Sequence, residues 1–251
     1  MQKTPINFFL CCFCFMASSV FSQDAKLFTV EIIKPAAGHM AEFEAAWQSH
    51  VAKFHATDKK KRYVYSILSG IHLGYYQLIE GPSSFKGMDA DNPAKKAHDL
   101  DYDRNVLTNI QERKGNLIYE YRDSLSYQSN PGSEKIVTVI FHLRNGTEQD
   151  FLGELKRTAD IDKKLSSDAS YNVYVLSLGG SSKQVMMIIN LKTGFAKLEE
   201  GYFPEVSEAF KQEYIREYSE RAWTRRIAFL NDLTAEYQIY IAKLNKPLSS
   251  H

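Results

Sequence analysis

Tyrosines, side-chain amides, one glutamate and one histidine recur at alternate positions of short runs rich in β-branched and aromatic residues. Alternate residues of a strand point to one face of a sheet, so these polar groups are expected to share one space. Tyrosine rings offer apolar faces and a hydroxyl group, and amides fix the orientation of a bound molecule. The residues that we predict to bind a small aromatic or amphipathic ligand are Glu31, Tyr65, Gln77, Tyr119, His142 and Tyr174.

Two other interpretations of this set stay open. Glu31 or His142 could act as the base that removes a proton from an activated aromatic substrate, with the tyrosines as orienting groups. Alternatively, the tyrosines reach the mouth of the enclosed space and bond to backbone or water. The first interpretation is an enzyme, and the second is a structural core without a ligand.

Histidines in the first half of the chain decide whether a metal site is expected. They are His39, His50, His55, His72 and His98. A metal site needs several ligands that converge, and the five-residue spacing of His50 and His55 on one predicted helix is poor for ligation. We therefore predict solvated or capping roles, with no metal and no cofactor. His142 is the one interior position in the second half that would suit an axial haem ligand.

The chain repeats itself. The segment 26–30, Lys-Leu-Phe-Thr-Val, is echoed 109 residues later by 135–139, Lys-Ile-Val-Thr-Val, and Val64-Tyr65 recurs at the same offset as Val173-Tyr174. Repeats of this length indicate two copies of one structural unit. We place the units at 24–122 and 135–246, joined by a linker at 123–134 that contains Ser, Asn, Pro and Gly.

Each unit reads as β-α-β-β-α-β. The predicted strands are 27–33, 62–69, 73–80 and 116–122 in the first copy, and 136–142, 171–178, 183–190 and 236–243 in the second. An apolar stripe that includes Phe43 and Trp47 marks the first helix. Tyr102, Val106 and Ile110 mark the second helix of the first copy, and Ser207 is expected to cap one long helix in the second.

Such a unit forms a four-stranded antiparallel sheet with both helices on one face. The other face must be covered, and the equivalent face of the sister copy is the nearest cover. The arrangement resembles the dimeric α+β barrel superfamily, with ferredoxin-like halves fused in one chain. That resemblance implies an α+β barrel, and it admits cofactor-free monooxygenases, haem enzymes of the chlorite dismutase kind, and proteins without an assigned activity.

Alternation then predicts which residues face the space between the sheets. In the first strand of copy one, Phe28, Val30 and Ile32 are uniformly apolar and are expected to face the helices, which turns Thr29, Glu31 and Ile33 inward. The same logic turns Tyr65, Gln77, Tyr119, His142 and Tyr174 inward, together with Tyr63, Thr138, Ile140, Asn172, Gln184 and Tyr240.

The first 22 residues predict a secretory signal peptide, with one lysine, an apolar run and small residues before Gln23. All three cysteines lie there, so no disulfide or thiolate metal site is expected afterwards. A net charge of +1 gives no electrostatic reason to expect nucleic acid or an anionic membrane as a partner. We predict a periplasmic or secreted protein, a monomer or weak homodimer.

These observations lead to one functional hypothesis with two alternatives. We expect an exported protein that binds a small aromatic or amphipathic molecule between its two sheets. The alternatives are a cofactor-independent monooxygenase-like enzyme and a haem-binding protein. The sequence contains neither a Gly-rich phosphate loop nor a nucleophile elbow, which disfavours serine and cysteine hydrolases.

Overall fold

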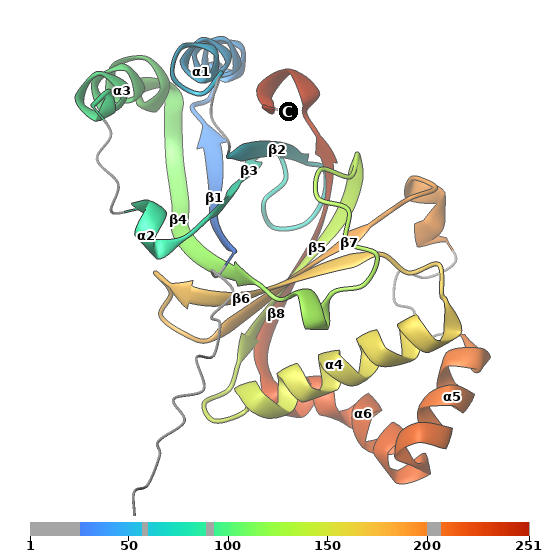
Figure 1. Ribbon diagram of the computed structural model, residues 1–251. Helices are drawn as coiled ribbons and strands as arrows, with labels where there is room; N and C mark the ends of the chain where they lie inside the picture. Colours follow the sequence, from blue (N-terminus) through green and yellow to red (C-terminus); the bar gives the residue numbers. More distant parts are fainter. Residues whose placement is uncertain (1–25, 57–59, 89–92, 200–206, 251) are drawn as a thin grey trace, which may run out of the picture.

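Eight antiparallel strands close into a barrel with helices on its outside (Figure 1). The computed structural model describes residues 26–56, 60–88, 93–199 and 207–250. The predicted signal peptide, 1–22, lies outside the described residues. Among the described helices, none combines the length and the apolar character needed to cross a bilayer.

The first unit follows the predicted order. It contains β1 (Leu27–Pro35), α1 (Met40–Phe54), β2 (Lys61–Ile67), β3 (Tyr76–Ser83), the short α2 (Phe85–Met88), α3 (Lys95–Asp101) and β4 (Ile110–Tyr121). A π-helical turn, Tyr102–Val106, and a 3₁₀ turn, Leu107–Asn109, continue α3. The prediction that Ile110 belongs to this helix is wrong, because the backbone becomes extended at that residue and β4 begins there.

The second unit repeats that order. It contains β5 (Lys135–Leu143), α4 (Glu148–Leu165), β6 (Tyr171–Leu178), β7 (Gln184–Asn190), α5 (Glu208–Tyr218), α6 (Glu220–Leu233) and β8 (Thr234–Leu244). The Ser207 side chain accepts a hydrogen bond from the Phe210 amide, which confirms the predicted helix cap. The predicted single long helix is wrong, because Ser219 has a φ of 97° and separates α5 from α6.

Smaller segments connect these elements. They are the 3₁₀ turns Asp123–Leu125, Phe195–Leu198 and Lys246–Leu248. The first of them lies in the segment 123–134, which we expected to be a linker. Leu125 and Tyr127 are buried against the second unit's core, and Tyr127 forms an antiparallel bridge with Tyr171.

The two units complete each other's sheet. The strand order around the barrel is β1-β3-β2-β8-β5-β7-β6-β4. The edge strand β2 pairs with β8 through Tyr65 and Leu244, and β4 pairs with β6 through Tyr121 and Tyr174. Each edge strand therefore finds a partner in the other unit, over residues 65–67 of β2 and 118–121 of β4, and this pairing closes the barrel.

Four apolar clusters lie among the described residues, one inside the barrel and three on its outer side. The interior cluster includes Phe28, Tyr65, Tyr119, Tyr174 and Tyr240, from both units. In the first unit, α1 and the π-helical turn cover the outer face. In the second unit, α4 packs on the outer face, and α5 and α6 pack against α4 (Figure 1).

The predicted orientation of β1 is wrong. Phe28, Val30 and Ile32 point into the barrel, and Ile33 packs against α1 on the outside. The prediction assumed that the most apolar face of the strand meets the helices. The closed interior is itself an apolar core, so it takes the apolar set, and Thr29 and Glu31 face the helix layer.

Candidate functional site

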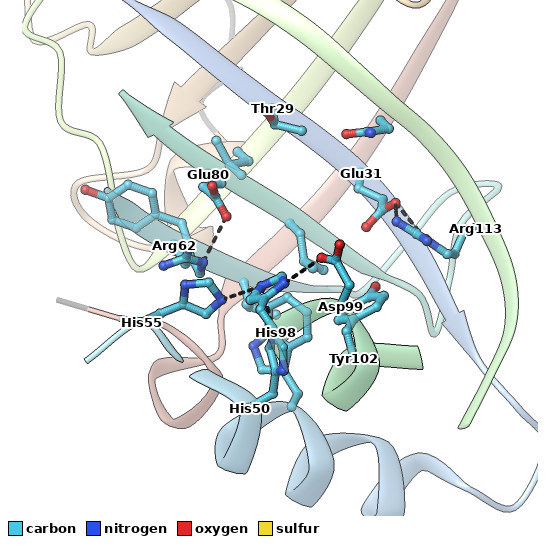
Figure 2. Close-up of a pocket in the computed structure, with 16 residues that line it drawn as sticks. Thr29, Glu31, His50, His55, Arg62, Glu80, His98, Asp99, Tyr102 and Arg113 are labelled. Carbon is cyan, nitrogen blue, oxygen red and sulfur yellow. Dashed lines mark hydrogen bonds and ion pairs between the residues drawn. The ribbon is translucent and has the colours of Figure 1, made fainter. Parts of the chain in front are cut away.

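A cavity of about 430 Å³ lies on the outer side of the first unit's sheet, under its helices. Strands β1 to β4 contribute residues that include Thr29, Glu31, Arg62, Glu80 and Arg113. The helix layer contributes Trp47, His50, His55, His98, Asp99 and Tyr102 (Figure 2). This volume suits a small organic molecule, and aromatic and charged groups both reach it.

Glu31 and Arg113 form an ion pair in this cavity. The Arg113 Nε atom donates to Glu31 Oε1 at 2.8 Å, and Nη2 contacts the same oxygen. Burial raises the pKa of Glu31, against the opposing effect of Arg113. The Arg113 guanidinium also lies over the Tyr102 ring, 5.4 Å from its centre. A carboxyl group with a raised pKa in a cavity is a candidate proton acceptor.

Arg62 and Glu80 supply a second ion pair. Arg62 Nε lies 2.9 Å from Glu80 Oε2, and the Arg62 side chain is only 6% exposed. The indole nitrogen of Trp47 donates to the Leu248 carbonyl oxygen at 2.9 Å, which ties the C-terminal turn to α1. These contacts hold a guanidinium and an indole ring in fixed positions along the cavity wall.

Three histidines meet at one end of the cavity. His98 Nε2 lies 3.2 Å from His50 Nε2 and 3.1 Å from His55 Nε2. One possible ligand atom from each ring lies within 4.8 Å of the others. Figure 2 shows the three rings grouped beside Arg62, apart from the Glu31–Arg113 pair.

Carboxylates orient two of these rings. His50 Nδ1 lies 2.9 Å from Asp101 Oδ2, and His98 Nδ1 lies 3.0 Å from Asp99 Oδ1. Hydrogen bonds from His50 and Lys53 lower the pKa of Asp101. Burial lowers the pKa of His50, although its bond to Asp101 opposes the shift. His50 is 2% exposed, so its ring is fixed in place as well as oriented.

The residues predicted to bind a ligand do not form one site. Tyr65, Gln77, Tyr119 and Tyr174 lie inside the barrel and are fully or almost fully buried. Glu31 lies on the other side of the sheet, in the cavity described above. His142 is half-buried on β5, where its Nδ1 lies 3.3 Å from Ser182 Oγ, and it does not line this cavity.

The interior polar groups bond to one another. Tyr119 Oη donates to Gln184 Oε1 at 2.8 Å, and Thr138 Oγ1 donates to Gln77 Oε1 at 3.2 Å. The Tyr174 ring packs edge-on against Phe28, with centres 5.3 Å apart. These contacts pair the Tyr119 hydroxyl group and the carbonyl oxygens of Gln77 and Gln184 within an aromatic core. A ligand-binding role for these tyrosines stays a prediction.

Comparisons with known proteins identify the fold. No family model matches the sequence, and no curated protein matches it. A candidate monooxygenase from Lactobacillus acidophilus has a TM-score of 0.54 at 8% identity, over 88% of this chain and 94% of its own. The chain has the dimeric α+β barrel fold.

Two further structures share this barrel. A candidate monooxygenase from Fusobacterium nucleatum has a TM-score of 0.52 at 11% identity, over 88% of this chain and 93% of its own. Chlorite dismutase from Candidatus Nitrospira defluvii has a TM-score of 0.51 at 8% identity, over 90% and 95%. Structural similarity at sequence identities this low establishes the fold alone, so the function has to be argued from the residues of the site.

Sequence reasoning missed the histidine cluster for a local reason. The five-residue spacing of His50 and His55 predicts poor ligation only if both lie on one helix, but α1 ends at Phe54 and His55 is its C-terminal cap. Its side chain is therefore not bound by helical periodicity. His98 comes from α3, 43 residues further along the chain, so only the fold brings it to the other two. Three of the five histidines thus meet, although the spacing of His50 and His55 favours solvated or capping roles.

Proposed function

We propose that this chain is an exported protein that binds a small aromatic or amphipathic molecule in the cavity between the first unit's sheet and its helices. The cavity carries the proposal, because it combines aromatic surfaces from Trp47 and Tyr102 with the guanidinium groups of Arg62 and Arg113. Aromatic surfaces bind rings, and guanidinium groups bind carboxylate or phenolate oxygens. An aromatic acid or phenol is therefore the ligand class that fits best.

This site differs from the one predicted between the sheets. The side chains of the interior cluster occupy the barrel, and the 430 Å³ cavity lies outside it. Export rests on the sequence of residues 1–22 alone. The test of binding does not depend on export, since it uses purified protein.

Binding can be tested by native mass spectrometry of protein from its own host, followed by titration of aromatic acids with detection by isothermal titration calorimetry. Arg113→Met should weaken the binding of an aromatic carboxylate at least about tenfold, because a charge-assisted bond is lost. Arg216→Met, at an exposed position of α5, is the matched control and should bind normally. Equal affinity in both variants would place the ligand elsewhere.

One observation favours a second candidate, a cofactor-independent monooxygenase-like enzyme. Burial raises the pKa of Glu31, and its carboxyl group faces the cavity beside Tyr102. In this scheme Glu31 removes a proton from an acidic C–H or O–H group of an activated aromatic substrate, and the resulting anion reacts with molecular oxygen. Glu31→Gln should then abolish oxygen uptake while binding persists. His142→Ala should leave both unchanged, since His142 does not line the cavity.

A further inference from the structure

The protons on two of the clustered rings can be assigned from their partners. An ionised carboxylate only accepts hydrogen bonds, so the Nδ1 atoms of His50 and His98 donate to Asp101 and Asp99. In a neutral imidazole the other nitrogen then carries a lone pair. The Nε2 atoms of His50 and His98 thus each carry a lone pair, and these two atoms face each other 3.2 Å apart. A positively charged species between them is needed to make this arrangement favourable.

We propose that His50, His55 and His98 bind one divalent transition-metal ion, with zinc(II) as the best match. Neutral imidazole is a preferred ligand of zinc, at a Zn–N distance of about 2.0–2.1 Å. Two such ligands in a tetrahedral complex lie about 3.3 Å apart. The separations of 3.1 and 3.2 Å between His98 Nε2 and its two neighbours are close to that value.

The surroundings of the rings match those of a metal site in a second respect. Metal-binding histidines commonly donate their remaining N–H group to a carboxylate, which fixes the ring and strengthens it as a ligand. Asp101 and Asp99 provide this contact for His50 and His98. Asp101 is itself held by Lys53, whose Nζ lies 3.0 Å from Asp101 Oδ1. The orientation of the rings is therefore built into α1 and α3.

Three histidine ligands leave one tetrahedral position for a further oxygen or nitrogen atom. All three histidines line the cavity, so this position opens toward it. Water would fill it in the free protein. An oxygen of the bound aromatic acid would replace that water, a step that rests on the proposed function. Metal binding itself does not, since it needs the three rings alone.

The test is titration of zinc(II) alone into the full-length chain after treatment with a chelator. Cys11, Cys12 and Cys14 are replaced by serine in every sample, because thiolates would compete for zinc. We expect one zinc ion per chain. His98→Ala should reduce the affinity at least about a hundredfold, since two ligands remain. His39→Ala makes the same change at an exposed histidine at the start of α1 and should leave binding unchanged.

Cobalt(II) provides a readout that a structural role for the histidines would not produce. Visible absorption typical of four-coordinate cobalt should appear in the starting protein and be lost in His98→Ala. X-ray absorption of the zinc form should show nitrogen or oxygen ligands at about 2.0 Å. Absence of stoichiometric zinc binding, or binding that His98→Ala and His39→Ala change equally, would overturn the proposal. The latter result would show an adventitious ion only.

Failure of this proposal can be told apart from failure of the proposed function. If zinc binds but Arg113→Met does not change the affinity for aromatic acids, the metal site stands and the proposed ligand site is rejected. Aromatic-acid binding without zinc binding would do the reverse. If the His50 and His98 rings instead share a proton, nuclear magnetic resonance would show that proton in the metal-free protein, unchanged by added zinc, and the metal site would be rejected.

Discussion

His50 Nε2 lies 3.2 Å from His98 Nε2, although the Nδ1 atom of each ring already meets a carboxylate. The two rings come from α1 and α3, so the helix layer of the first unit is what holds them together. The same helix layer covers the cavity that contains Glu31 and Arg113. The candidate site is thus assembled between a rigid sheet and two helices, which is where a preorganised site is most precise.

Removing the carboxylate behind His50 should weaken metal binding without removing a ligand. Asp101→Asn keeps the size of the side chain and deletes its charge, and changes of this kind typically cost about 10–100-fold in metal affinity. Competition with a chromophoric chelator would measure the change. Asp150→Asn, at the exposed start of α4, is the control. Unchanged affinity in Asp101→Asn would contradict the assigned role of Asp101.

Glu31 should give stability a specific pH dependence. Burial raises the pKa of Glu31 above its ordinary value of 4.5. The folded protein therefore keeps the Glu31 proton at pH values where the unfolded chain has lost it. The contribution of this proton to stability is complete below the pKa of Glu31 in the unfolded chain, and it is lost as pH rises through the pKa in the folded protein. The unfolding free energy of the wild type minus that of Glu31→Gln should therefore fall as the pH rises above the ordinary carboxyl pKa of 4.5.

Urea denaturation at a series of pH values would measure this difference. Glu208→Gln, on the exposed first turn of α5, provides the comparison for a carboxylate outside the cavity. A difference between wild type and Glu31→Gln that grows with pH would mean that Arg113 outweighs burial, and the assignment of Glu31 as a proton acceptor would lose its support.

Tyr119→Phe should destabilise the protein and leave the cavity unaffected. The hydroxyl group donates to Gln184 Oε1 at 2.8 Å inside the barrel, so its loss leaves a buried acceptor unpaired. We expect a loss of about 1–2 kcal/mol in the free energy of unfolding. Zinc and aromatic-acid binding should persist, because Tyr119 lies on the interior side of the sheet. Tyr237→Phe, 58% exposed on β8, should change neither property.

A contrary result for Tyr119→Phe would restore the interior site. Loss of aromatic-acid binding in this variant, with normal circular dichroism and normal zinc binding, would locate the ligand between the sheets. Tyr65 and Tyr174, also buried in the interior cluster, would then become the next positions to substitute.

Closure of the barrel can be probed at the β2–β3 turn. Gly70 and Gly74 both have positive φ angles, +84° and +81°, so alanine at either should cost about 1–2 kcal/mol in backbone strain. A Cβ at Gly70 would also lie 2.7 Å from the Ile239 carbonyl oxygen on β8, whereas one at Gly74 would meet nothing within 4 Å. Gly70→Ala should therefore unfold at clearly lower urea concentration than Gly74→Ala. Equal stabilities would argue against the close contact between β8 and this turn.

The sequence alone was enough to predict the duplicated unit and the class of barrel. The echo of residues 26–30 at 135–139 marks the repeat, and the alternation in each strand requires a second sheet to cover the first. These features are local or periodic, so they can be read without knowing which segments meet. The Ser207 cap belongs to the same group, since it involves a side chain and an amide three residues apart.

Only the tertiary structure decided which face of β1 is inside and which histidines meet. Both alternate sets of β1 contain apolar residues, and a shift of one residue in the register exchanges the two faces of the strand. Burial of apolar surface on closing the barrel therefore decides that Phe28 and Val30 face the interior. The histidine cluster depends on a helix end and on a partner 43 residues away at His98. Contacts of this kind are set by how helices pack on a sheet, which residue spacing does not encode.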